Sequence, residues 1–581
     1  MQDPGKTEPK PSRLVELPLE LQGMIFEDVN YSDLNRLCLT CKTIKAVVLP
    51  KLYHQVVIRV PQKWSRLPSL EGLLGSTGDG LKYTTELSIE TQQSPLRDSQ
   101  RESEDSRPPE EVLAETKLQF YLPQISASNA LNTLIRLLIV KLPQNRLEVF
   151  RWEHSCELNV STLNLLFERQ EANLDILFCN RLSSACNVSG SVIEGIDQLS
   201  VESMDLSRGG CQWAASMLVE NAETLDHLDL GFNNRIAHDF ALNRRPQYDK
   251  MCASFAVDVK KTLSAKGLEP PVDLLLESVY LCGLDFRSVI QGEMALDIDF
   301  NDVIELRLES CPGLSQAFSL LTGQGDSSRL ALGALQVLFV RLEDPDPNFS
   351  TSLESFLTSV RGLNHLQVLI DNALTVQYLE PILKVHGKTL ETLVWDERRG
   401  PRTRLDASTS MFSPRLGNLK VIARNCPSLT LLGIPLDWEV ISSSDKLHEA
   451  IARAFIKMPY LKVLNIRNLP EISGRSAMPM DYFVKGLAAM FVDIVNKKRK
   501  STLLKTVAIG APLYRDIHIG THHVVHTAVS DFLRFRIYNI DYDYPSPSGL
   551  SPVLSEICKG AARSSEGQFC HAKLLCNHWL G

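Results

Sequence analysis

Histidine and cysteine gather near the C-terminal end of the sequence, where their side chains could ligate a metal ion. The residues are His518, His522, His523 and His526, followed by Cys570, His571, Cys576 and His578. Zinc sites with two Cys pairs, or with a Cys pair and a His pair, need characteristic short and long intervals between ligands. Neither group has these intervals, so we predict ordinary surface and core residues and no metal site. A metal-dependent enzyme built on this region stays as an outside alternative.

Other catalytic signals are incomplete. Gly75 and Gly80 have the spacing of a phosphate-binding loop, but Lys82 comes one residue too late to be its lysine. The GxSxG of serine hydrolases, the HExxH of zinc peptidases and the GxGxxG of dinucleotide enzymes are all missing from the sequence. We therefore predict a protein with no catalytic residue and no cofactor.

The composition limits the class of partner. The 581 residues are 44% hydrophobic and 22% charged, as in an ordinary folded protein, and the formal net charge is -8. The basic excess that accompanies binding to nucleic acid or to a membrane surface is therefore missing. These numbers favour a protein or a small molecule as partner, with no nucleic acid and no membrane.

The sequence carries no sign of secretion. Its first residues contain no apolar signal segment, so we expect the thirteen cysteines to be reduced and the sequons at Asn159, Asn187 and Asn348 to be chance matches. The most apolar stretch, Leu131 to Leu142, is too short to span a membrane. We expect a soluble protein of the cytoplasm, the nucleus or both.

The main pattern after residue 80 is a recurring LxxLxL motif. Its clearest copies are Leu225-Leu228-Leu230 followed by Asn233, and Val303-Leu306-Leu308 followed by Cys311. Both fit the leucine-rich-repeat template, which has Asn or Cys at its turn position. Further copies are Leu147-Phe150-Trp152, Leu174-Leu177-Cys179, Val201-Met204-Leu206, Leu276-Val279-Leu281, Leu335-Leu338-Val340, Leu366-Leu369, Leu390-Leu393-Trp395, Leu429-Leu432-Ile434, Leu461-Leu464-Ile466 and Leu504-Val507-Ile509.

The spacing of these copies indicates a solenoid. The middle residues Phe150, Leu177, Met204 and Leu228 are 27, 27 and 24 residues apart, within the range of leucine-rich repeats. Later steps lengthen, which predicts an irregular array with insertions. Helix-like stretches such as Trp213 to Ala222 and Asp445 to Lys457 lie between copies. Strands inside and helices outside predict an α/β horseshoe.

The template also predicts a binding surface. The residue between the last two apolar positions of each copy points out of the concave sheet. These outward positions are Arg151, Phe178, Asp205, Asp229, Tyr280 and Arg307, continued by Phe339, Val394 and Asn465. Their mixture of charges with aromatic and aliphatic groups suits a protein substrate better than a phosphate backbone. Taken singly, each is better explained as a solvated strand residue.

Three short helices are expected within Leu14 to Ile58. Pro18 suits the opening turn of the first helix, whose apolar stripe is Leu21, Met24, Ile25 and Val29. Ser32 is the expected N-cap of the second helix, and the third runs from Thr43 to Leu49 and ends before Pro50. So short a segment cannot bury all its apolar residues, so another chain or the rest of this one must cover some of them.

These residues resemble the F-box in order and spacing. The matching residues are Leu17-Pro18, Glu20-Leu21, Ile25-Phe26, Asp33-Leu34, Leu37, Leu39, Cys41-Lys42 and Leu49-Pro50. F-boxes often carry a Trp shortly after the Cys-Lys pair, where this sequence has Ile44. The alternative is a generic helical cap on the following domain. The ending His578-Trp579-Leu580-Gly581 is similar in style to terminal segments of fungal F-box proteins.

The resemblance is to fungal-type F-box proteins with leucine-rich repeats, and it implies a non-catalytic adaptor of a Skp-cullin-F-box ubiquitin ligase. The F-box would bind a Skp-type adaptor protein, and through it a cullin, while the repeats hold an unknown protein substrate. The docking residues that the resemblance implies are Leu17, Pro18, Leu21, Ile25, Leu34, Leu37 and Pro50. A leucine-rich-repeat scaffold without a role in ubiquitylation is the alternative.

The expected domain organisation has four parts. Residues 1–13 form a disordered leader, residues 14–60 the F-box, and residues 61–513 the solenoid. Within the solenoid, residues 91–112 are rich in charge, Ser and Pro, which predicts a mobile insert. Residues 514–581 form a capping region and tail, with a strand expected from Phe532 to Tyr544 because aromatic and aliphatic residues alternate there.

Overall fold

The structure, a computed structural model, divides the chain into two compact units. The described part of the first unit ends at Phe178, and that of the second begins at Cys179. The described residues are 14–61 (except 28), 80–92, 128–182 (except 155), 192–204, 208–232, 245–322, 332–371 (except 344), 373, 379–397, 416–435, 453–467, 485, 488–489, 504–509, 536–546 and 549–556. The predicted leader and most of the predicted insert and C-terminal region lie outside these residues.

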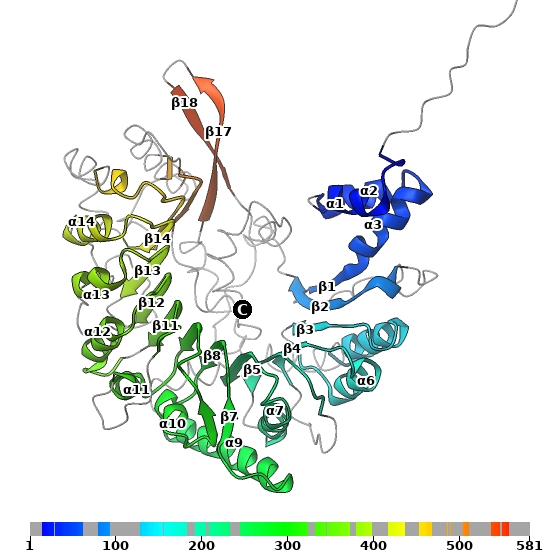
Figure 1. The fold of residues 1–581 in the computed structure, drawn as a ribbon, viewed down its shortest axis with the longest axis horizontal. Helices are drawn as coiled ribbons and strands as arrows, with labels where there is room; N and C mark the ends of the chain where they lie inside the picture. The colour runs from blue at the N-terminus through cyan, green and yellow to red at the C-terminus, as the bar shows by residue number, and fades with distance from the viewer. Residues whose placement is uncertain are drawn as a thin grey trace, which may run out of the picture. The chain divides into compact units, whose positions relative to one another are not determined.

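The first unit begins with three short helices, as predicted (Figure 1). They are α1 (Leu19–Ile25), α2 (Tyr31–Cys38) and α3 (Lys42–His54). Two details of the prediction are wrong. Asn30, not Ser32, caps α2, because its side chain accepts a hydrogen bond from the Asp33 backbone N at 3.0 Å. Helix α3 also continues through Pro50, because its next turn places Leu52 in the core of the three helices.

The three helices share a small core of their own. It consists of Phe26, Leu34, Ile44, Val48 and Leu52. Lys51 Nζ donates to the Phe26 carbonyl oxygen at 2.8 Å, and so ties α3 to the end of α1. Gln22 Nε2 donates to the Leu17 carbonyl oxygen at 2.7 Å and holds the segment before α1 against the helix. The inward-facing residues of the three helices therefore pack against one another and pair their polar groups.

Helix α3 leads directly into a sheet. β1 (Gln55–Pro61) follows it without a linker and pairs in parallel with β2 (Glu86–Gln92), which pairs in parallel with β3 (Val149–Glu153). The Thr85 backbone N donates to the His54 carbonyl oxygen at 2.9 Å. Gly80 lies against Tyr53, where an added Cβ would meet the ring at 2.6 Å. The end of α3 is therefore fixed to the first strands, and β1 begins inside the range predicted for the F-box.

The rest of the first unit carries the start of the repeat pattern. Its elements are η1 (Leu81–Tyr83), a helix over residues 128–141 and α6 (Val160–Gln170). β4 (Ile176–Arg181) spans the division between the two units.

The second unit alternates parallel strands with helices. Its main strands are β5 (Gln198–Met204), β6 (His227–Phe232), β8 (Ser278–Cys282), β10 (Glu305–Glu309), β11 (Val337–Glu343), β12 (His365–Asp371), β13 (Thr392–Glu397), β14 (Leu431–Ile434), β15 (Val463–Ile466) and β16 (Thr506–Ile509). Each pairs in parallel with the next in this order. β17 (Arg536–Ser546) and β18 (Gly549–Glu556) then continue antiparallel. β17 covers much of the strand predicted from Phe532 to Tyr544.

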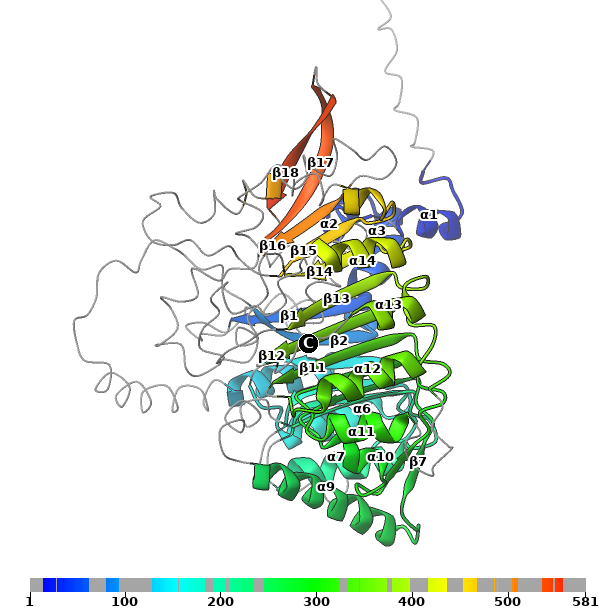
Figure 2. The same ribbon diagram turned by 90° about the vertical axis from the view of Figure 1, so that its left-hand side faces the viewer.

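The helices of the second unit are α7 (Arg208–Glu220), α9 (Arg245–Ala265), α10 (Phe286–Ile290), α11 (Leu314–Leu321), α12 (Phe349–Ser359), α13 (Leu379–His386) and α14 (Leu416–Asn425). Figure 2 shows α11 to α14 stacked along one side of their strands. β7 (Val272–Leu274) and β9 (Leu296–Ile298) form a separate small sheet. Strands alternating with helices confirm the predicted α/β class and are consistent with a leucine-rich-repeat solenoid.

A ladder of buried aliphatic residues explains why the strands stack. One apolar residue of each of these strands pairs in register with its counterpart on the next strand, and all of these residues are almost fully buried. The ladder in the second unit is Leu228, Val279, Leu306, Leu338, Leu366, Leu393, Leu432, Leu464 and Val507. Each such side chain contributes about 1.5–3 kcal/mol on burial. No single repeat could bury its ladder residue alone, so the strands must stack.

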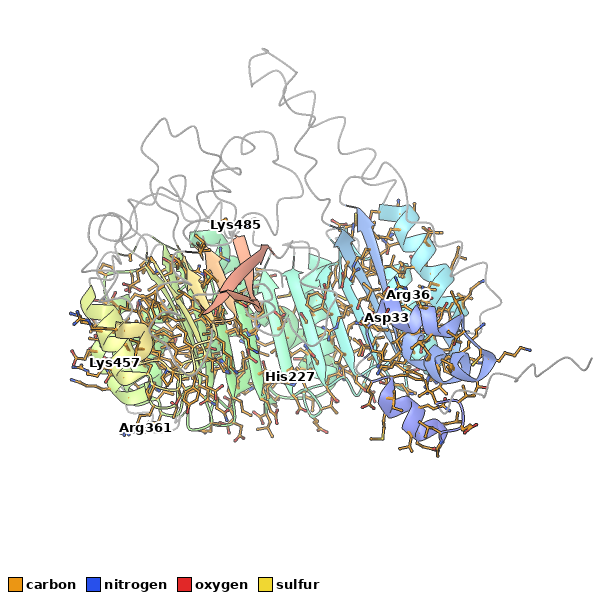
Figure 3. All side chains as sticks on the ribbon, turned by 90° about the horizontal axis from the view of Figure 1, so that it is seen from above. Asp33, Arg36, His227, Arg361, Lys457 and Lys485 are labelled. Carbon is orange, nitrogen blue, oxygen red and sulfur yellow. The ribbon has the colours of Figure 1, made fainter. Side chains whose placement is uncertain are left out.

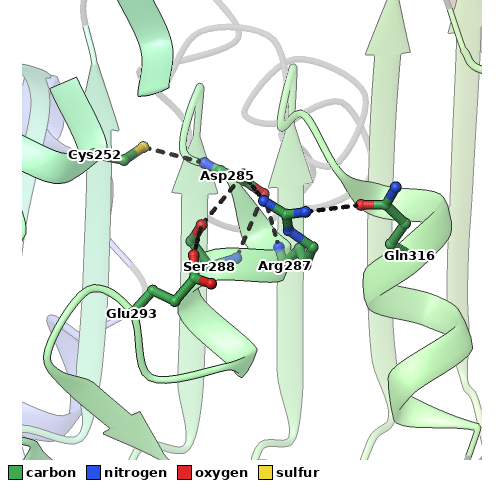
Figure 4. Close-up of polar contacts among 6 residues, drawn as sticks. All are labelled: Cys252, Asp285, Arg287, Ser288, Glu293 and Gln316. Carbon is green, nitrogen blue, oxygen red and sulfur yellow. Dashed lines mark hydrogen bonds and ion pairs between the residues drawn. The ribbon is translucent and has the colours of Figure 1, made fainter. Parts of the chain in front are cut away.

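The junction around α10 links three consecutive repeats (Figure 4). The Asp285 side chain caps α10 by accepting from the backbone N atoms of Arg287 at 3.1 Å and Ser288 at 3.5 Å. Cys252 Sγ from α9 accepts from the Asp285 backbone N at 3.5 Å, and Arg287 Nη1 donates to Gln316 Oε1 of α11 at 3.4 Å. These bonds hold α9, α10 and α11 at fixed positions behind the sheet.

Candidate functional site

The outer side of α1 is an exposed apolar face. Leu19, Leu21, Met24 and Ile25 are 60%, 44%, 63% and 49% exposed, whereas Gln22 and Phe26 on the inner side are buried. At 3.6 residues per turn, Leu21, Met24 and Ile25 share the side of α1 that faces away from the buried Phe26, whereas Leu19 lies on the same side as Phe26 and is exposed at the start of the helix. Tyr31 and Leu39 at the two ends of α2 are also exposed. We call Leu21, Met24 and Ile25 the α1 face.

The docking residues implied by the F-box resemblance fall into three groups. Pro18, Leu21 and Ile25 are exposed on or next to α1, and Leu17, Leu37 and Pro50 are half-buried. Leu34 is only 4% exposed and belongs to the core of the three helices. In the free chain its side chain supports the packing of the three helices.

Leu19 and Met24 are exposed apolar residues that the docking set of the sequence analysis left out. Met24 was already visible in the apolar stripe of the predicted first helix. No feature of the sequence marked Leu19 as exposed, because its exposure depends on how α1 packs against α3.

A second candidate surface is a row of residues across the sheet of the second unit. It consists of Ser200, Asp229, Tyr280, Arg307, Phe339, Gln367, Val394, Gly433, Asn465 and Ala508, each in register with the next. Alternate residues of a strand point to opposite faces, so this row lies on the face opposite the buried ladder. We call it the central row. It brings together six of the nine outward positions that the motif predicts.

The other three predicted positions lie elsewhere. Arg151 is half-buried on β3 of the first unit, in register with Ser88 of β2. Phe178 is half-buried on β4. Asp205 lies outside the described residues, and Ser200 is the β5 residue in register with Asp229. Gln367 belongs to the row but was not predicted, because its motif copy looked incomplete in the sequence.

Three neighbouring residues of the central row are more accessible than Ser200 before them and the residues after them. Asp229, Tyr280 and Arg307 are half-buried, whereas Phe339, Val394 and Asn465 are almost fully buried. The accessible part therefore combines one carboxyl, one phenol and one guanidinium on three neighbouring strands.

Polar contacts orient these side chains. Ser200 Oγ donates to Asp229 Oδ2 at 2.7 Å, and Tyr280 OH donates to Glu309 Oε2 at 2.7 Å. Arg307 forms an ion pair with Glu305 on its own strand. Burial raises the pKa of Asp229 to about 7, although the Ser200 hydrogen bond and the Arg307 charge act in the opposite direction. Burial therefore favours the protonated, uncharged form of this carboxyl in the folded chain.

The described residues show neither a metal-binding cluster nor a membrane-spanning helix. They contain no group of three or more His, Cys, Asp or Glu arranged to hold a metal ion. Their helices include none with the length and apolar character needed to cross a membrane. Every cysteine that the structure describes is a free thiol. The His and Cys groups near the C-terminal end and Gly75 lie outside the described residues.

Comparison with known proteins identifies the helical segment. Residues 14–53 match the family model of the F-box domain, which corresponds to α1, α2 and all but the last residue of α3. A search of curated proteins finds none that matches the chain. The chain therefore carries an F-box domain at residues 14–53, followed by a long parallel sheet consistent with repeats.

Proposed function

We propose that the chain is the substrate-recognition adaptor of a Skp-cullin-F-box type ubiquitin ligase. The observation that carries this proposal is the match to the F-box domain over the same helices that leave the α1 face exposed. F-box proteins typically bind a Skp-type adaptor and are non-catalytic subunits. The α1 face would meet that adaptor, and the adaptor would connect the chain to a cullin.

The α1 face has the chemistry that such docking needs. Interface cores are apolar, and their binding energy comes from a few side chains that lose water on association. Covering the exposed part of each of the three side chains would contribute about 1 kcal/mol. The total of about 3 kcal/mol is a substantial share of a micromolar interaction, for which the free energy is about -8 kcal/mol.

The accessible part of the central row is the proposed substrate surface. Tyr and Arg are enriched among the residues that dominate protein interfaces, and Tyr280 and Arg307 lie side by side there. The chain would need no catalytic residue of its own. Holding a substrate lysine near the charged ubiquitin-conjugating enzyme turns a bimolecular step into a nearly intramolecular one.

Co-purification with a Skp-type adaptor tests the docking step. The double variant Pro18→Ala/Ile25→Asp should lose the adaptor, because a carboxylate would be buried in an apolar interface. Leu137→Asp is the matched control, because Leu137 is 51% exposed on a different helix and the substitution adds the same charge. The docking proposal is refuted when the double variant retains the adaptor as well as the control does.

The scaffold alternative predicts the same docking without turnover of the bound protein. The test measures the abundance of each protein that the full chain captures. Abundance is compared between cells that express the chain and cells from which it is deleted, separately in the cytoplasm and in the nucleus. An adaptor predicts that at least one captured protein becomes more abundant when the chain is deleted. Unchanged levels of all captured proteins would favour the scaffold.

A further inference from the structure

An unsatisfied carboxyl oxygen lies in the accessible part of the central row. Asp229 on β6 is half-buried and lies in register with Tyr280 of β8 on one side and Ser200 of β5 on the other. Its Oδ2 atom accepts from Ser200 Oγ at 2.7 Å. Its buried Oδ1 atom has no hydrogen-bond partner in the part of the chain that the structure describes. A buried acceptor without a partner is costly, so this carboxyl has a vacant position for a donor.

The charged side chains near Asp229 are already paired with one another. Arg307 forms an ion pair with Glu305 on its own strand, and Arg341 of β11 forms one with Glu309 of β10. Among the described residues, none forms an ion pair with Asp229. When Asp229 is ionised, these five side chains hold three carboxylates and two guanidinium groups, so one negative charge is in excess. Charge complementarity therefore favours a cation as the ligand.

The surroundings of Asp229 on its own strand point the same way. His227, labelled in Figure 3, lies two residues earlier on β6 and so faces the same side of the sheet. Burial raises the pKa of Asp229, and the Glu309 charge acts in the same direction. The Ser200 hydrogen bond and the Arg307 charge lower that pKa without cancelling the effect of burial. A cation bound beside Asp229 would therefore stabilise a carboxylate that the free chain disfavours.

The carboxyl group of Asp229 can offer either oxygen to such a ligand. The last side-chain bond of an aspartate rotates with a broad, roughly two-fold preference, so the two oxygen atoms can exchange places. An ionised carboxylate has about four acceptor positions, and the Ser200 hydroxyl uses one of them. A ligand can therefore donate to Asp229 while Ser200 keeps its hydrogen bond.

Tyr280 decides which cation fits best. Neighbouring strands are about 4.8 Å apart, so its ring lies beside Asp229. Tyr280 OH donates to Glu309 Oε2 at 2.7 Å, which orients the ring. A guanidinium is planar and has five N–H donors, so it can lie against an aromatic ring and donate to a carboxylate at the same time. It is also more weakly hydrated than an ammonium group, so a half-buried site favours arginine over lysine.

We propose that Asp229 and Tyr280 form a subsite for one arginine side chain of the protein substrate. The subsite rests on the proposed function, because it lies on the surface that we assign to the substrate. A metal ion would be a different cation, but the described residues contain no group of three or more His, Cys, Asp or Glu that could hold one. An arginine requires only the carboxylate and the ring.

Peptide selection on the purified full chain tests the subsite. The probe is a displayed library of random ten-residue peptides. Peptides selected on the wild type should be enriched in arginine at one position, and those selected on Asp229→Asn should lack this enrichment. A wild-type selection without arginine enrichment, or one that yields no binding peptide, would overturn the proposal. The chain is used without the Skp-type adaptor, so a failure of adaptor docking would refute the proposed function and leave this result intact.

A double-mutant cycle on the most enriched peptide locates the contact. Replacing its arginine with citrulline, the neutral isostere, should weaken the Kd about tenfold for the wild type and less than about twofold for Asp229→Asn. Replacing the arginine with lysine should also weaken binding to the wild type. An equal effect of citrulline on the wild type and on Asp229→Asn would overturn the proposal.

Two further variants separate the ring from the net charge. Tyr280→Leu should weaken binding of the arginine peptide about threefold, because the aromatic face is lost. Asp273→Asn removes the same charge as Asp229→Asn from an exposed position on β7, in the separate small sheet, and should bind the peptide like the wild type. Thermal unfolding of each variant checks that it is folded. Losses of equal size in Asp273→Asn and Asp229→Asn would overturn the proposal, because the effect would then come from net charge.

Discussion

Leu34 and Ile25 were assigned the same docking role by their place in the F-box pattern, but the structure gives them different environments. Leu34 is 4% exposed inside the three-helix core, and Ile25 is 49% exposed on the α1 face. Truncation to alanine should therefore separate stability from binding. Leu34→Ala should destabilise the F-box helices, and Ile25→Ala should mainly weaken adaptor binding.

The expected magnitudes follow from these exposures. A buried Leu→Ala substitution costs about 2–5 kcal/mol of unfolding free energy. The 40 residues of the F-box match carry a total stability of about 2–6 kcal/mol at typical values per residue, so Leu34→Ala should remove most of it. Ile25 has buried only half of its side chain in the free chain, so its truncation should cost the fold about 1 kcal/mol. The same amount lost on docking weakens the Kd about fivefold.

Two assays on the full chain measure these effects. Hydrogen exchange of the α3 amides reports the opening free energy of the three helices, and titration calorimetry with a Skp-type adaptor reports the Kd. Leu34→Ala should lower the opening free energy of the α3 amides by about 2–5 kcal/mol, whereas Ile25→Ala should lower it by only about 1 kcal/mol and weaken the Kd. The reasoning fails if Ile25→Ala loosens α3 as much as Leu34→Ala does, or leaves the Kd unchanged.

Two further predictions concern the second unit. Gly387→Ala should lower the unfolding free energy by about 1–3 kcal/mol, because the added Cβ would overlap the Asn425 carbonyl oxygen. The control Gly210→Ala, in the first turn of α7 where the added Cβ meets no atom, should be neutral or stabilising by up to about 1 kcal/mol. Equal changes in the melting temperature of the two variants would contradict this. The folded-state pKa of Asp229, about 7, lies above its ordinary value of 3.8, so this residue should make stability fall as pH rises from about 4 to 7. Burial lowers the pKa of His154 to about 4, which makes stability rise with pH over the same range. The test is therefore the unfolding free energy in urea of the wild type and of Asp229→Asn, measured across this pH range. If the two pH profiles are parallel, the pH dependence does not come from Asp229.

Period-two alternation made much of the sheet predictable. From Leu228 onward, wherever a motif copy was complete, as around Leu228 and Leu306, its outward residue lies in the central row. Prediction failed at β5, where two apolar triads overlap in the sequence. The motif favoured Met204 as the middle residue, but pairing with β6 places Leu199 beside Leu228 instead. Strand register depends on the neighbouring strand, which a single motif does not contain.

Tertiary packing decided the features that the sequence did not reveal. Pro50 predicts a helix end locally, but burial of Leu52 against the other helices favours another turn of α3. The exposed side of α1 likewise depends on how α1 packs against α3.

Oxidative footprinting of Met24 in the full chain, with and without a Skp-type adaptor, tests the central claim most directly. Met24 is 63% exposed on the α1 face, and Tyr460 of the second unit, at 58%, serves as the internal reference. The account predicts that the adaptor slows oxidation of Met24 several-fold and leaves Tyr460 unchanged. Equal oxidation of Met24 with and without bound adaptor would contradict docking through the α1 face.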